Sequence, residues 1–464
     1  MKLKFIIPRE NYLNDVQDIV RGFFPYLQID EDAEEYLKVD YVYSNSVFYL
    51  MISSSFSGEK SASFDVSSDD NSLYKKLTKR FIKNCIYDYL SNYFNVSLPY
   101  GSLTGVRPTK LYYEILGYHN EPESMLKSEF RVSSSRAELI GKAVKAQKGI
   151  YQPSLETADI YVNIPFCPTR CAYCSFISSE VKKVEKLLPK YAESTAREID
   201  AIISILYKSN KKLKSVYIGG GTPTSIGVNN LEKILEPLSC LDVEFTVEAG
   251  RPDTLTEEML DMLKRKNVTR LSVNPQSFNQ KTLDKIGRKH SVDAVYEGFR
   301  IAREKGFIVN MDLIALLPEE DFEDFSYSLE KAIELRPDNI TIHTLSIKRG
   351  AELSAIESER GLALGMTDYA YSRLEKEGYM PYYMYRQKNM ADNLENVGFS
   401  IKGKECVYNI DMMEETNAVY GAGAGAMTKL FYLYGAIERV SNPKGIKEYL
   451  ERIDTIIGNK NNLL

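Results

Sequence analysis

Three cysteines, Cys167, Cys171 and Cys174, lie within eight residues of one another. Thiolates at CxxxCxxC spacing on one loop can bind three irons of a [4Fe–4S] cluster. The other cysteines are distant in sequence: Cys85, Cys240 and Cys406. No fourth cysteine ligand is at hand, so we expect the fourth iron to be open to an exchangeable ligand. The alternatives are a three-cysteine zinc site, which needs a fourth ligand, and three free thiols.

A second group of candidate residues follows strands further along the chain. The segment 217–224 reads YIGGGTPT, and its glycines allow the backbone to approach a ligand closely. Single polar residues end, follow or interrupt the next strands: Glu248, Gln276, Arg288 and Asp312. Asp312 lies inside an apolar run, where a carboxylate is costly unless it is hydrogen-bonded. Each of these residues is also compatible with an ordinary turn, ion pair or helix cap.

The elements that must position these residues alternate in the middle of the chain. Short apolar strands are predicted at 160–164, 215–218, 244–247, 270–273, 308–313 and 339–344. Helices are predicted between them at 184–207, 229–238, 254–266, 292–305 and 321–335. Thr254, followed three residues later by Glu257, indicates a capping box. This alternation predicts a parallel sheet, whose strand ends build the active site because their loops converge.

The flanking parts of the chain are less regular. Before residue 155 the sequence predicts a strand at 2–7, a hairpin at 39–53 and helices at 71–94 and 136–147. Cys85 lies in the apolar stripe of the 71–94 helix, which is typical of a buried structural cysteine. We expect an α/β fold, an open partial (β/α)6 TIM-like barrel with an N-terminal α+β domain and a smaller C-terminal domain. The expected domain boundaries are 1–155, 156–350 and 351–464.

Composition excludes several classes of protein. Asp and Glu (64) slightly exceed Lys and Arg (59), and the net charge of −5 argues against a general nucleic-acid binder. The chain has only 3 His, which argues against a multi-histidine metal site. The first apolar run is too short for a signal peptide, and no stretch of about 18 apolar residues predicts a membrane span. We therefore expect a cytoplasmic protein with reduced thiols and no membrane partner.

A strand, the CxxxCxxC loop and further β/α units in this order resemble the radical S-adenosylmethionine (SAM) enzymes. The resemblance implies that the open iron binds the amino and carboxylate groups of SAM, and that one electron from the cluster cleaves SAM to a 5′-deoxyadenosyl radical. It also implies that Tyr173 lies near the adenine. Gly219, Gly220, Gly221 and Thr222 match the motif that binds the methionine amino group. A one-electron donor such as flavodoxin or ferredoxin is implied as a partner.

Within this family the chain resembles the oxygen-independent coproporphyrinogen III oxidase (coproporphyrinogen dehydrogenase) branch. The shared segments are 161–167 (YVNIPFC), 219–222, 270–278 (RLSVNPQSF), 312–318 (DLIALLP) and 420–426. The resemblance assigns Glu248 and Asp312 to the hydroxyl groups of SAM, with Gln276 beside them, and Arg288 to its carboxylate. Arginine can bind a carboxylate through two hydrogen bonds, which suits that role. Tyr161, retained in this branch, is the candidate catalytic residue.

The segments 103–110 (LTGVRPTK) and 381–398 resemble the HemZ-type subgroup, so the resemblance covers nearly the whole chain. It implies oxidative decarboxylation of coproporphyrinogen III, a tetrapyrrole whose propionates require cations and whose rings require apolar walls. The candidate cations are Arg107, Lys110, Arg386 and Lys388, and the candidate walls are Tyr382, Tyr383 and Tyr385. A solvated basic surface over packed tyrosines is the alternative for these residues.

Some positions depart from typical members of the branch. Phe176 stands where the oxidases have a further cysteine, and Asn163 stands where they have a histidine. The related heme chaperones carry a His-Asn pair before the glycine run, and Tyr408-Asn409 occupies that place here. Cys406 is either a heme ligand or, as we prefer, a buried thiol. Two further hypotheses stay open: a heme-binding chaperone of the same fold, and a radical enzyme acting on heme or another tetrapyrrole.

Overall fold

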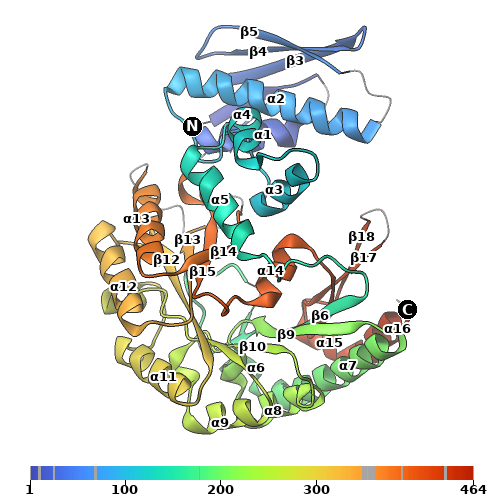
Figure 1. Ribbon diagram of the computed structural model, residues 1–464, viewed down its shortest axis with the longest axis vertical. Helices are drawn as coiled ribbons and strands as arrows, with labels where there is room; N and C mark the ends of the chain where they lie inside the picture. The colour runs from blue at the N-terminus through green and yellow to red at the C-terminus, as the bar shows by residue number, and fades with distance from the viewer. Residues whose placement is uncertain are drawn as a thin grey trace. The chain divides into compact units, whose positions relative to one another are not determined.

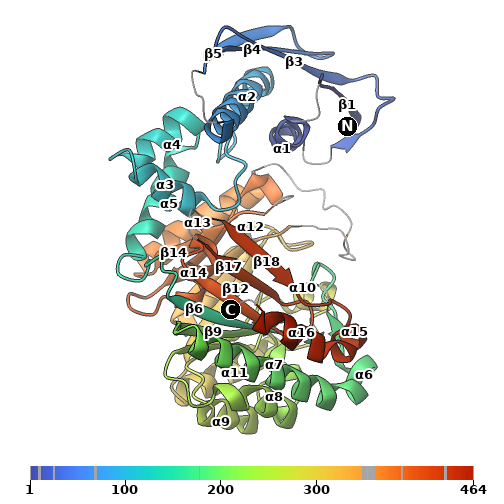
Figure 2. The ribbon, with the colours of Figure 1, turned by 90° about the vertical axis from the view of Figure 1, so that its right-hand side faces the viewer.

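The computed structural model describes residues 2–8, 12–24, 27–66, 71–176, 178–346, 353, 361–387, 390–432 and 436–462. The chain divides into two compact units, which are described separately (Figures 1 and 2). Unit 1 comprises Met1–Val144, Glu357–Leu364 and Tyr385–Glu395. Unit 2 comprises Lys145–Ile356, Gly365–Met384 and Asn396–Leu464. The three-part division at residues 155 and 350 stays a prediction.

Unit 1 is built on a five-stranded sheet in the order β2-β1-β3-β4-β5. Strands β1–β2 and β1–β3 pair in parallel, whereas β3–β4 and β4–β5 are antiparallel. The strands are β1 (Lys2–Ile6), β2 (Gln28–Ile29), β3 (Tyr36–Ser44), β4 (Val47–Ser54) and β5 (Lys60–Asp65). The helices before residue 147 are α1 (Leu13–Phe23), α2 (Asn71–Phe94), α3 (Pro108–Leu116), α4 (Pro122–Phe130) and α5 (Ser134–Ala146).

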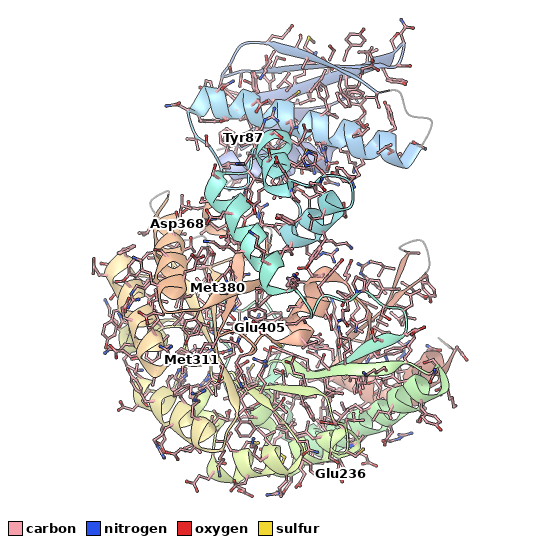
Figure 3. The ribbon with its side chains drawn as sticks, viewed as in Figure 1. Tyr87, Glu236, Met311, Asp368, Met380 and Glu405 are labelled. Carbon is pink, nitrogen blue, oxygen red and sulfur yellow. The ribbon has the colours of Figure 1, made fainter. Side chains whose placement is uncertain are left out.

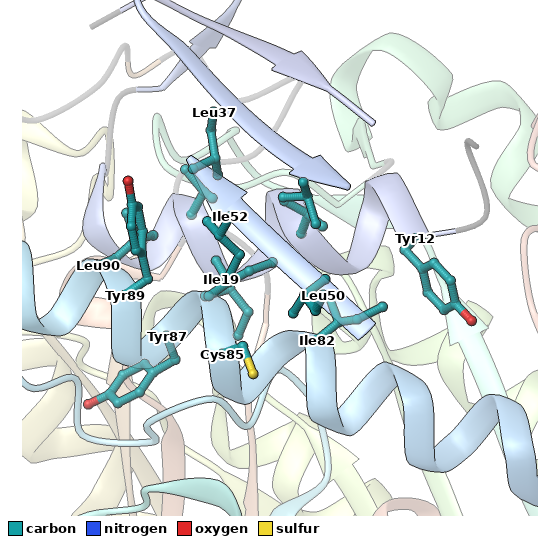
Figure 4. Close-up of a cluster of buried hydrophobic side chains, with 14 of the residues drawn as sticks. Tyr12, Ile19, Leu37, Leu50, Ile52, Ile82, Cys85, Tyr87, Tyr89 and Leu90 are labelled. Carbon is teal, nitrogen blue, oxygen red and sulfur yellow. The ribbon is translucent and has the colours of Figure 1, made fainter. Parts of the chain in front are cut away.

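Helices α1 and α2 pack with the sheet around one apolar cluster. Ile19 of α1, Ile82 of α2 and Ile52 of β4 belong to it (Figure 4). Cys85 is buried in the same cluster, as expected. The predicted hairpin is formed by β3 and β4, whose two turn residues, 45 and 46, adopt positive φ, as a tight hairpin turn requires.

Unit 2 is built on an 11-stranded sheet in the order β14-β15-β13-β12-β11-β10-β9-β6-β16-β17-β18. The core strands are β6 (Thr157–Ile164), β9 (Lys212–Gly220), β10 (Glu244–Glu248), β11 (Arg270–Ser272), β12 (Ile308–Ala315) and β13 (Asn339–Thr344). They pair in parallel in the order of the sequence, which confirms the predicted (β/α)6 core. Over the described residues the sheet ends at β14 and β18 without closing.

Helices follow these strands and arc around the outside of the curved sheet (Figure 1). They are α7 (Leu188–Lys208), α8 (Val228–Leu235), α9 (Glu257–Arg265), α11 (Val292–Glu304), α12 (Phe322–Leu335) and α13 (Leu362–Lys376). The short helix α10 (Gln280–Lys285) precedes α11 and borders the cysteine loop. Side chains fill the space between sheet and helices (Figure 3), where Met311 of β12 is fully buried. The predicted capping box at Thr254 is wrong. Residues 252–254 form a 3-10 turn, and Thr256 caps α9 by accepting a hydrogen bond from the Met259 amide.

The C-terminal segments extend the same sheet at both ends. Strand β16 (Ala418–Ala422) pairs in parallel with β6 and continues into antiparallel β17 (Met427–Phe431) and β18 (Ile437–Ser441). At the other end lie β15 (Asn396–Ser400) and β14 (Met380–Tyr385). The remaining elements are β7 (Phe166–Cys167), β8 (Ser179–Glu180), α6 (Val181–Val184), α14 (Val407–Glu414), α15 (Ile446–Glu451) and α16 (Ile453–Asn461). No helix among the described residues is long and apolar enough to cross a membrane.

Candidate functional site

The three predicted cluster ligands lie on the loop that follows β6 in unit 2. Cys167 ends β7, and the Cys174 amide donates to the Cys171 carbonyl oxygen at 3.0 Å. Burial raises the pKa of Cys167 and of Cys174, and the neighbouring Cys171 thiol raises the pKa of each of them further. Among the described residues, no three His, Cys, Asp or Glu side chains converge on a point that would hold one metal ion. In a four-iron cluster each thiolate binds a different iron.

The glycine segment at the end of β9 packs directly against the cysteine loop. The Thr222 amide donates to the Phe166 carbonyl oxygen at 2.7 Å, and its hydroxyl lies 3.8 Å from Cys167 Sγ. A Cβ on Gly221 would lie 2.4 Å from the Phe166 carbonyl oxygen and 2.9 Å from Cys167 Sγ. Only glycine fits there, because the backbone is already in contact with the predicted ligand.

Glu248, at the end of β10, lies over the same segment. Tyr217 Oη donates a hydrogen bond to Glu248 Oε1 at 2.6 Å, and a Cβ on Gly219 would lie 3.0 Å from Glu248 Cδ. Burial raises the pKa of Glu248 to about 7, and the charge of Asp312 adds to that rise. The hydrogen bond from Tyr217 acts in the opposite direction. The carboxyl group is therefore poised to change its charge near neutral pH.

Asp312, on β12, is ionised by its partners. Asn274 Nδ2 donates to Asp312 Oδ2 at 2.7 Å, and Asn310 Nδ2 donates to Oδ1 at 2.8 Å. His343 Nε2 lies 3.5 Å from Oδ2. Burial alone would raise the pKa of Asp312, but His343 and the hydrogen bonds outweigh burial and lower it. These contacts offset the cost of a carboxylate inside the sheet.

Gln276 lies beside Asp312 in a strained backbone conformation. Its φ is +68°, and its amide donates to the Asp312 carbonyl oxygen at 2.9 Å. The side-chain oxygen, Oε1, is buried and has no hydrogen-bond partner. Leaving a buried acceptor unpaired costs about 1–3 kcal/mol, and a bound ligand that donates a hydroxyl hydrogen would remove this cost. The orphaned oxygen therefore fits the ribose of SAM.

Arg288 connects the cysteine loop to the strand ends. Its Nη2 donates to the carbonyl oxygens of Gly250 and Asn274, the latter at 2.7 Å. Its Nη1 lies 3.4 Å from Tyr173 Oη and 4.0 Å from Cys171 Sγ. Burial raises the pKa of Tyr173, which keeps the phenol neutral. The structure thus brings Tyr173 and Arg288 to the predicted cluster, as a role toward SAM requires.

Tyr161 belongs to a stack of three tyrosine rings. Its ring centroid lies 6.3 Å from that of Tyr217 and 6.1 Å from that of Tyr408, and the last two are 4.5 Å apart. Tyr161 Oη donates to Asn163 Oδ1 at 3.1 Å. Burial raises the pKa of Tyr161 far above its ordinary value. Tyr408, at the place of the chaperones' histidine, is thus packed into this stack.

Cys406 is a buried thiol. Its Sγ donates to Glu244 Oε1 at 3.3 Å, and burial raises its pKa. This placement agrees with a structural cysteine.

The predicted substrate residues divide between the two units. In unit 1, Arg386 is buried: its guanidinium donates to the carbonyl oxygens of Leu103 and Asn393 and lies 4.1 Å over the ring of Tyr100. Arg386 is therefore engaged in the packing of unit 1, and its contact with a substrate carboxylate stays a prediction. Half-buried candidates of unit 1 are Arg107, Lys110 and Tyr385, and buried candidates of unit 2 are Tyr382 and Tyr383. Lys388 lies outside the described residues.

The site also holds residues that the sequence prediction missed: Tyr217, Asn274, Asn310 and His343. Alternate residues of a strand share one face, so Tyr217 could have been found from Gly219 and Asn310 from Asp312. The contact of His343 with Asp312 depends on the register of β13 against β12, in which Thr341 lies opposite Asp312. Such a register is not readable from one sequence.

Comparisons with known proteins agree with this geometry. Residues 161–332 match the radical SAM superfamily. The oxygen-independent coproporphyrinogen-III oxidase-like protein HemZ of Bacillus subtilis is 37% identical over 399 residues, which cover 82% of this chain and 79% of the relative. The heme chaperone HemW of Lactococcus lactis is 32% identical over 311 residues, 64% of this chain and 74% of the relative. The structure of coproporphyrinogen III oxidase (HemN) from Escherichia coli aligns with a TM-score of 0.51 and 20% identity, over 68% of this chain and 73% of that one. This last likeness shows the fold alone.

The family match makes a [4Fe–4S] cluster and SAM the cofactors of this enzyme. The residues present fit them: three thiols on one loop, a glycine segment in contact with that loop, and the orphaned amide oxygen of Gln276. The chain belongs to the radical SAM oxidoreductases, in the family of oxygen-independent coproporphyrinogen III oxidase-like proteins of the HemZ type.

Proposed function

We propose that the protein converts coproporphyrinogen III to protoporphyrinogen IX, a step of heme biosynthesis, by oxidative decarboxylation of two propionates to vinyl groups. The observation that carries the proposal is the 37% identity to a coproporphyrinogen-III oxidase-like protein over 82% of the chain. In this reaction each propionate gives a hydrogen atom from its β-carbon to the SAM-derived radical, releases carbon dioxide and passes one electron to an external one-electron acceptor, and a vinyl group remains. The proposal includes a one-electron donor protein and a cytoplasmic location.

The proposal assigns a role to each residue of the site. Cys167, Cys171 and Cys174 hold the cluster, which together with SAM supplies a radical able to remove hydrogen from the propionate. The backbone of residues 219–222 would approach the methionine moiety of SAM. Glu248, Gln276 and Asp312 would accept hydrogen bonds from its ribose hydroxyls, and Arg288 would pair with its carboxylate.

Tyr161 is our candidate for contact with the substrate. Because its hydroxyl hydrogen is donated to Asn163, the Tyr161 oxygen can still accept a hydrogen bond. A pyrrole N–H of the tetrapyrrole is a donor of the required kind, so Tyr161 orients the substrate by accepting a hydrogen bond from it.

An anaerobic assay tests the proposal. The protein with reconstituted cluster, reductant and SAM is offered coproporphyrinogen III, and the tetrapyrroles are identified by mass spectrometry. We expect loss of carbon dioxide from two propionates. Cys167→Ala abolishes conversion, whereas Cys240→Ala, at an exposed cysteine away from the loop, preserves it. A Cys167→Ala protein that still cleaves SAM reductively would contradict the mechanism.

The second candidate is a heme chaperone, which is favoured by the 32% identity to HemW over 64% of the chain. A chaperone binds heme in a fixed ratio, leaves it unchanged, and does not convert coproporphyrinogen III. Heme is therefore offered in a parallel reaction. Consumption of heme would instead indicate a radical enzyme that acts on heme.

A further inference from the structure

The loop that holds the predicted cluster ligands reaches the surface of unit 2. All three cysteines are partly exposed, and Arg170, between the first two, is exposed. Phe176, two residues after the last ligand, exposes 66% of its surface. A single exposed aromatic side chain is common on protein surfaces, so Phe176 indicates a contact surface only together with the charges around it.

Lysines flank this loop on one side. Strand β7 pairs with β8 so that Cys167 lies opposite Glu180, and α6 begins at the next residue. Lys182, Lys183 and Lys186 are exposed there, and Lys183, with 72% of its side chain open to solvent, pairs with Glu180 at 3.1 Å. Helix α6 is drawn at the lower right of Figure 2, before the start of α7. Over residues 166–190, five Lys and Arg stand against two Glu, in a chain whose net charge is −5.

A second group of lysines flanks the loop from the segment that follows β11. The Ala172 amide donates to the Ile286 carbonyl oxygen at 3.0 Å, and the Thr169 hydroxyl donates to the Gly287 carbonyl oxygen at 3.2 Å. The residues next to these contacts include exposed Lys285 and Lys289. Lys285 is paired with Glu319 at 2.7 Å. The cluster loop is thus flanked by cations on two elements that contact it.

We propose that this basic surface beside the cluster loop, which also carries Phe176, docks an acidic one-electron carrier protein that reduces the cluster. Interfaces for electron transfer are small, with an apolar centre and a charged rim, and opposite charges steer such partners together. One electron leaves the reduced carrier and enters the cluster, and no bond or proton changes place. The inference rests on the proposed function only in requiring a cluster that accepts an electron.

Two matched variants test this surface. The first, Lys182→Glu/Lys183→Glu/Lys186→Glu, reverses the charge beside the cluster loop. The control, Lys208→Glu/Lys212→Glu/Lys233→Glu, makes the same change of net charge at other exposed lysines. Lys208 ends α7, about 30 Å along that helix from α6 at 1.5 Å per residue, and Lys212 begins β9, at the opposite strand end from the glycine segment.

The assay measures reduction of the cluster in each reconstituted protein by its loss of visible absorbance, with a reduced acidic flavodoxin or with dithionite. We expect the first variant to slow reduction by flavodoxin about tenfold or more at low salt and to weaken flavodoxin binding equally. The first variant should leave the rate of reduction by dithionite unchanged. Added salt should lower the rate at which flavodoxin reduces the wild-type cluster toward the rate of the variant. The control variant should behave as the wild type.

Equal rates with flavodoxin in the wild type and the first variant would overturn the inference, as would an equal loss of rate with dithionite. Because the readout is the cluster and not the tetrapyrrole, failure of the proposed function is seen separately. A protein whose cluster flavodoxin reduces, but which leaves coproporphyrinogen III unchanged, contradicts the proposed substrate and supports the docking surface.

Discussion

Glu248 is a buried carboxyl group of the site with a strongly raised pKa. Burial raises its pKa to about 7, and we assign its ionised form to the ribose hydroxyls of SAM. Below pH 7 the carboxyl group must lose a proton before it can act as a charged acceptor. We therefore predict that the affinity for SAM falls as pH drops through about 7, approaching tenfold per pH unit.

Equilibrium binding of SAM to the protein with intact cluster measures this effect. Glu248→Gln should bind SAM more weakly and without this pH dependence, since its amide does not titrate. Tyr217→Phe removes the hydrogen bond that lowers the pKa of Glu248, so it should move the transition to higher pH. A Glu248→Gln protein that keeps the wild-type pH profile would contradict the assignment.

Asn163 joins Tyr161 to Ala424 through one amide. Its Oδ1 accepts the hydrogen of Tyr161 Oη at 3.1 Å, and its Nδ2 donates to the Ala424 carbonyl oxygen at 2.6 Å. Asn163→Ala leaves both partners unpaired in a mostly buried region. We predict a loss of about 1–3 kcal/mol in the free energy of unfolding, measured by urea denaturation. A loss below about 0.5 kcal/mol, the size of an ordinary surface substitution, would contradict this role.

At the scale of elements, the close approach of the ends of β6 and β9 depends on the glycine segment at the end of β9. Gly220 has φ +112°, and a Cβ there would lie 2.3 Å from Asn163 Oδ1. Gly227 also has a positive φ, +84°, but nothing lies within 4 Å of its Cβ position. Gly227→Ala should cost about 1 kcal/mol from backbone strain alone.

Gly220→Ala should lower the free energy of unfolding more than Gly227→Ala does, because backbone strain and the clash with Asn163 add together. Denaturation curves of the two variants under one condition give the difference. If both variants lose the same free energy of unfolding, β6 and β9 approach each other less closely than the structure shows.

A buried ion pair fixes the C-terminal elements to α7. Glu198 accepts hydrogen bonds from the Gly423 amide at 2.8 Å and from Tyr449 Oη at 2.7 Å, and Lys460 Nζ lies 3.4 Å from it. Lys460 also donates to the Gly421 carbonyl oxygen at 2.8 Å. Burial lowers the pKa of Lys460. The glycine run 421–426 is thus held in place by Glu198 of α7 and Lys460 of α16.

Removing one charge of this pair should be costly, because the other is left buried and unpaired. We predict that Lys460→Met lowers the free energy of unfolding by about 3–5 kcal/mol. Adding Glu198→Gln should recover part of the loss, since no charge then remains. If the double variant loses as much free energy of unfolding as the two single variants together, the coupling is contradicted.

Much of the element order could be predicted because periodicity and strand-end chemistry are local. The helix over 71–94 and the six parallel strands are confirmed. The error at Thr254 arose because two threonines compete for one cap, and the 3-10 turn at 252–254 selects Thr256. Local patterns place an element well but leave its first residue undecided.

At the scale of the molecule, the site residues that depend on long-range packing escaped prediction. Arg386 looked like an open cation, but Leu103, from a segment 283 residues away, accepts its hydrogen bond. The cysteines and Asp312 could be predicted as site residues because their chemistry is unusual for their sequence context. His343 and Asn274 became visible only when sheet register brought them to Asp312.

The central claim is that one polypeptide cleaves SAM and decarboxylates coproporphyrinogen III in the same reaction. The most direct measurement is the anaerobic mass balance of 5′-deoxyadenosine against vinyl groups, with the cluster reconstituted and reduced. We predict that both products form together and that neither forms in Cys171→Ala. Coproporphyrinogen III recovered unchanged, while SAM is cleaved or heme is bound, would contradict the claim.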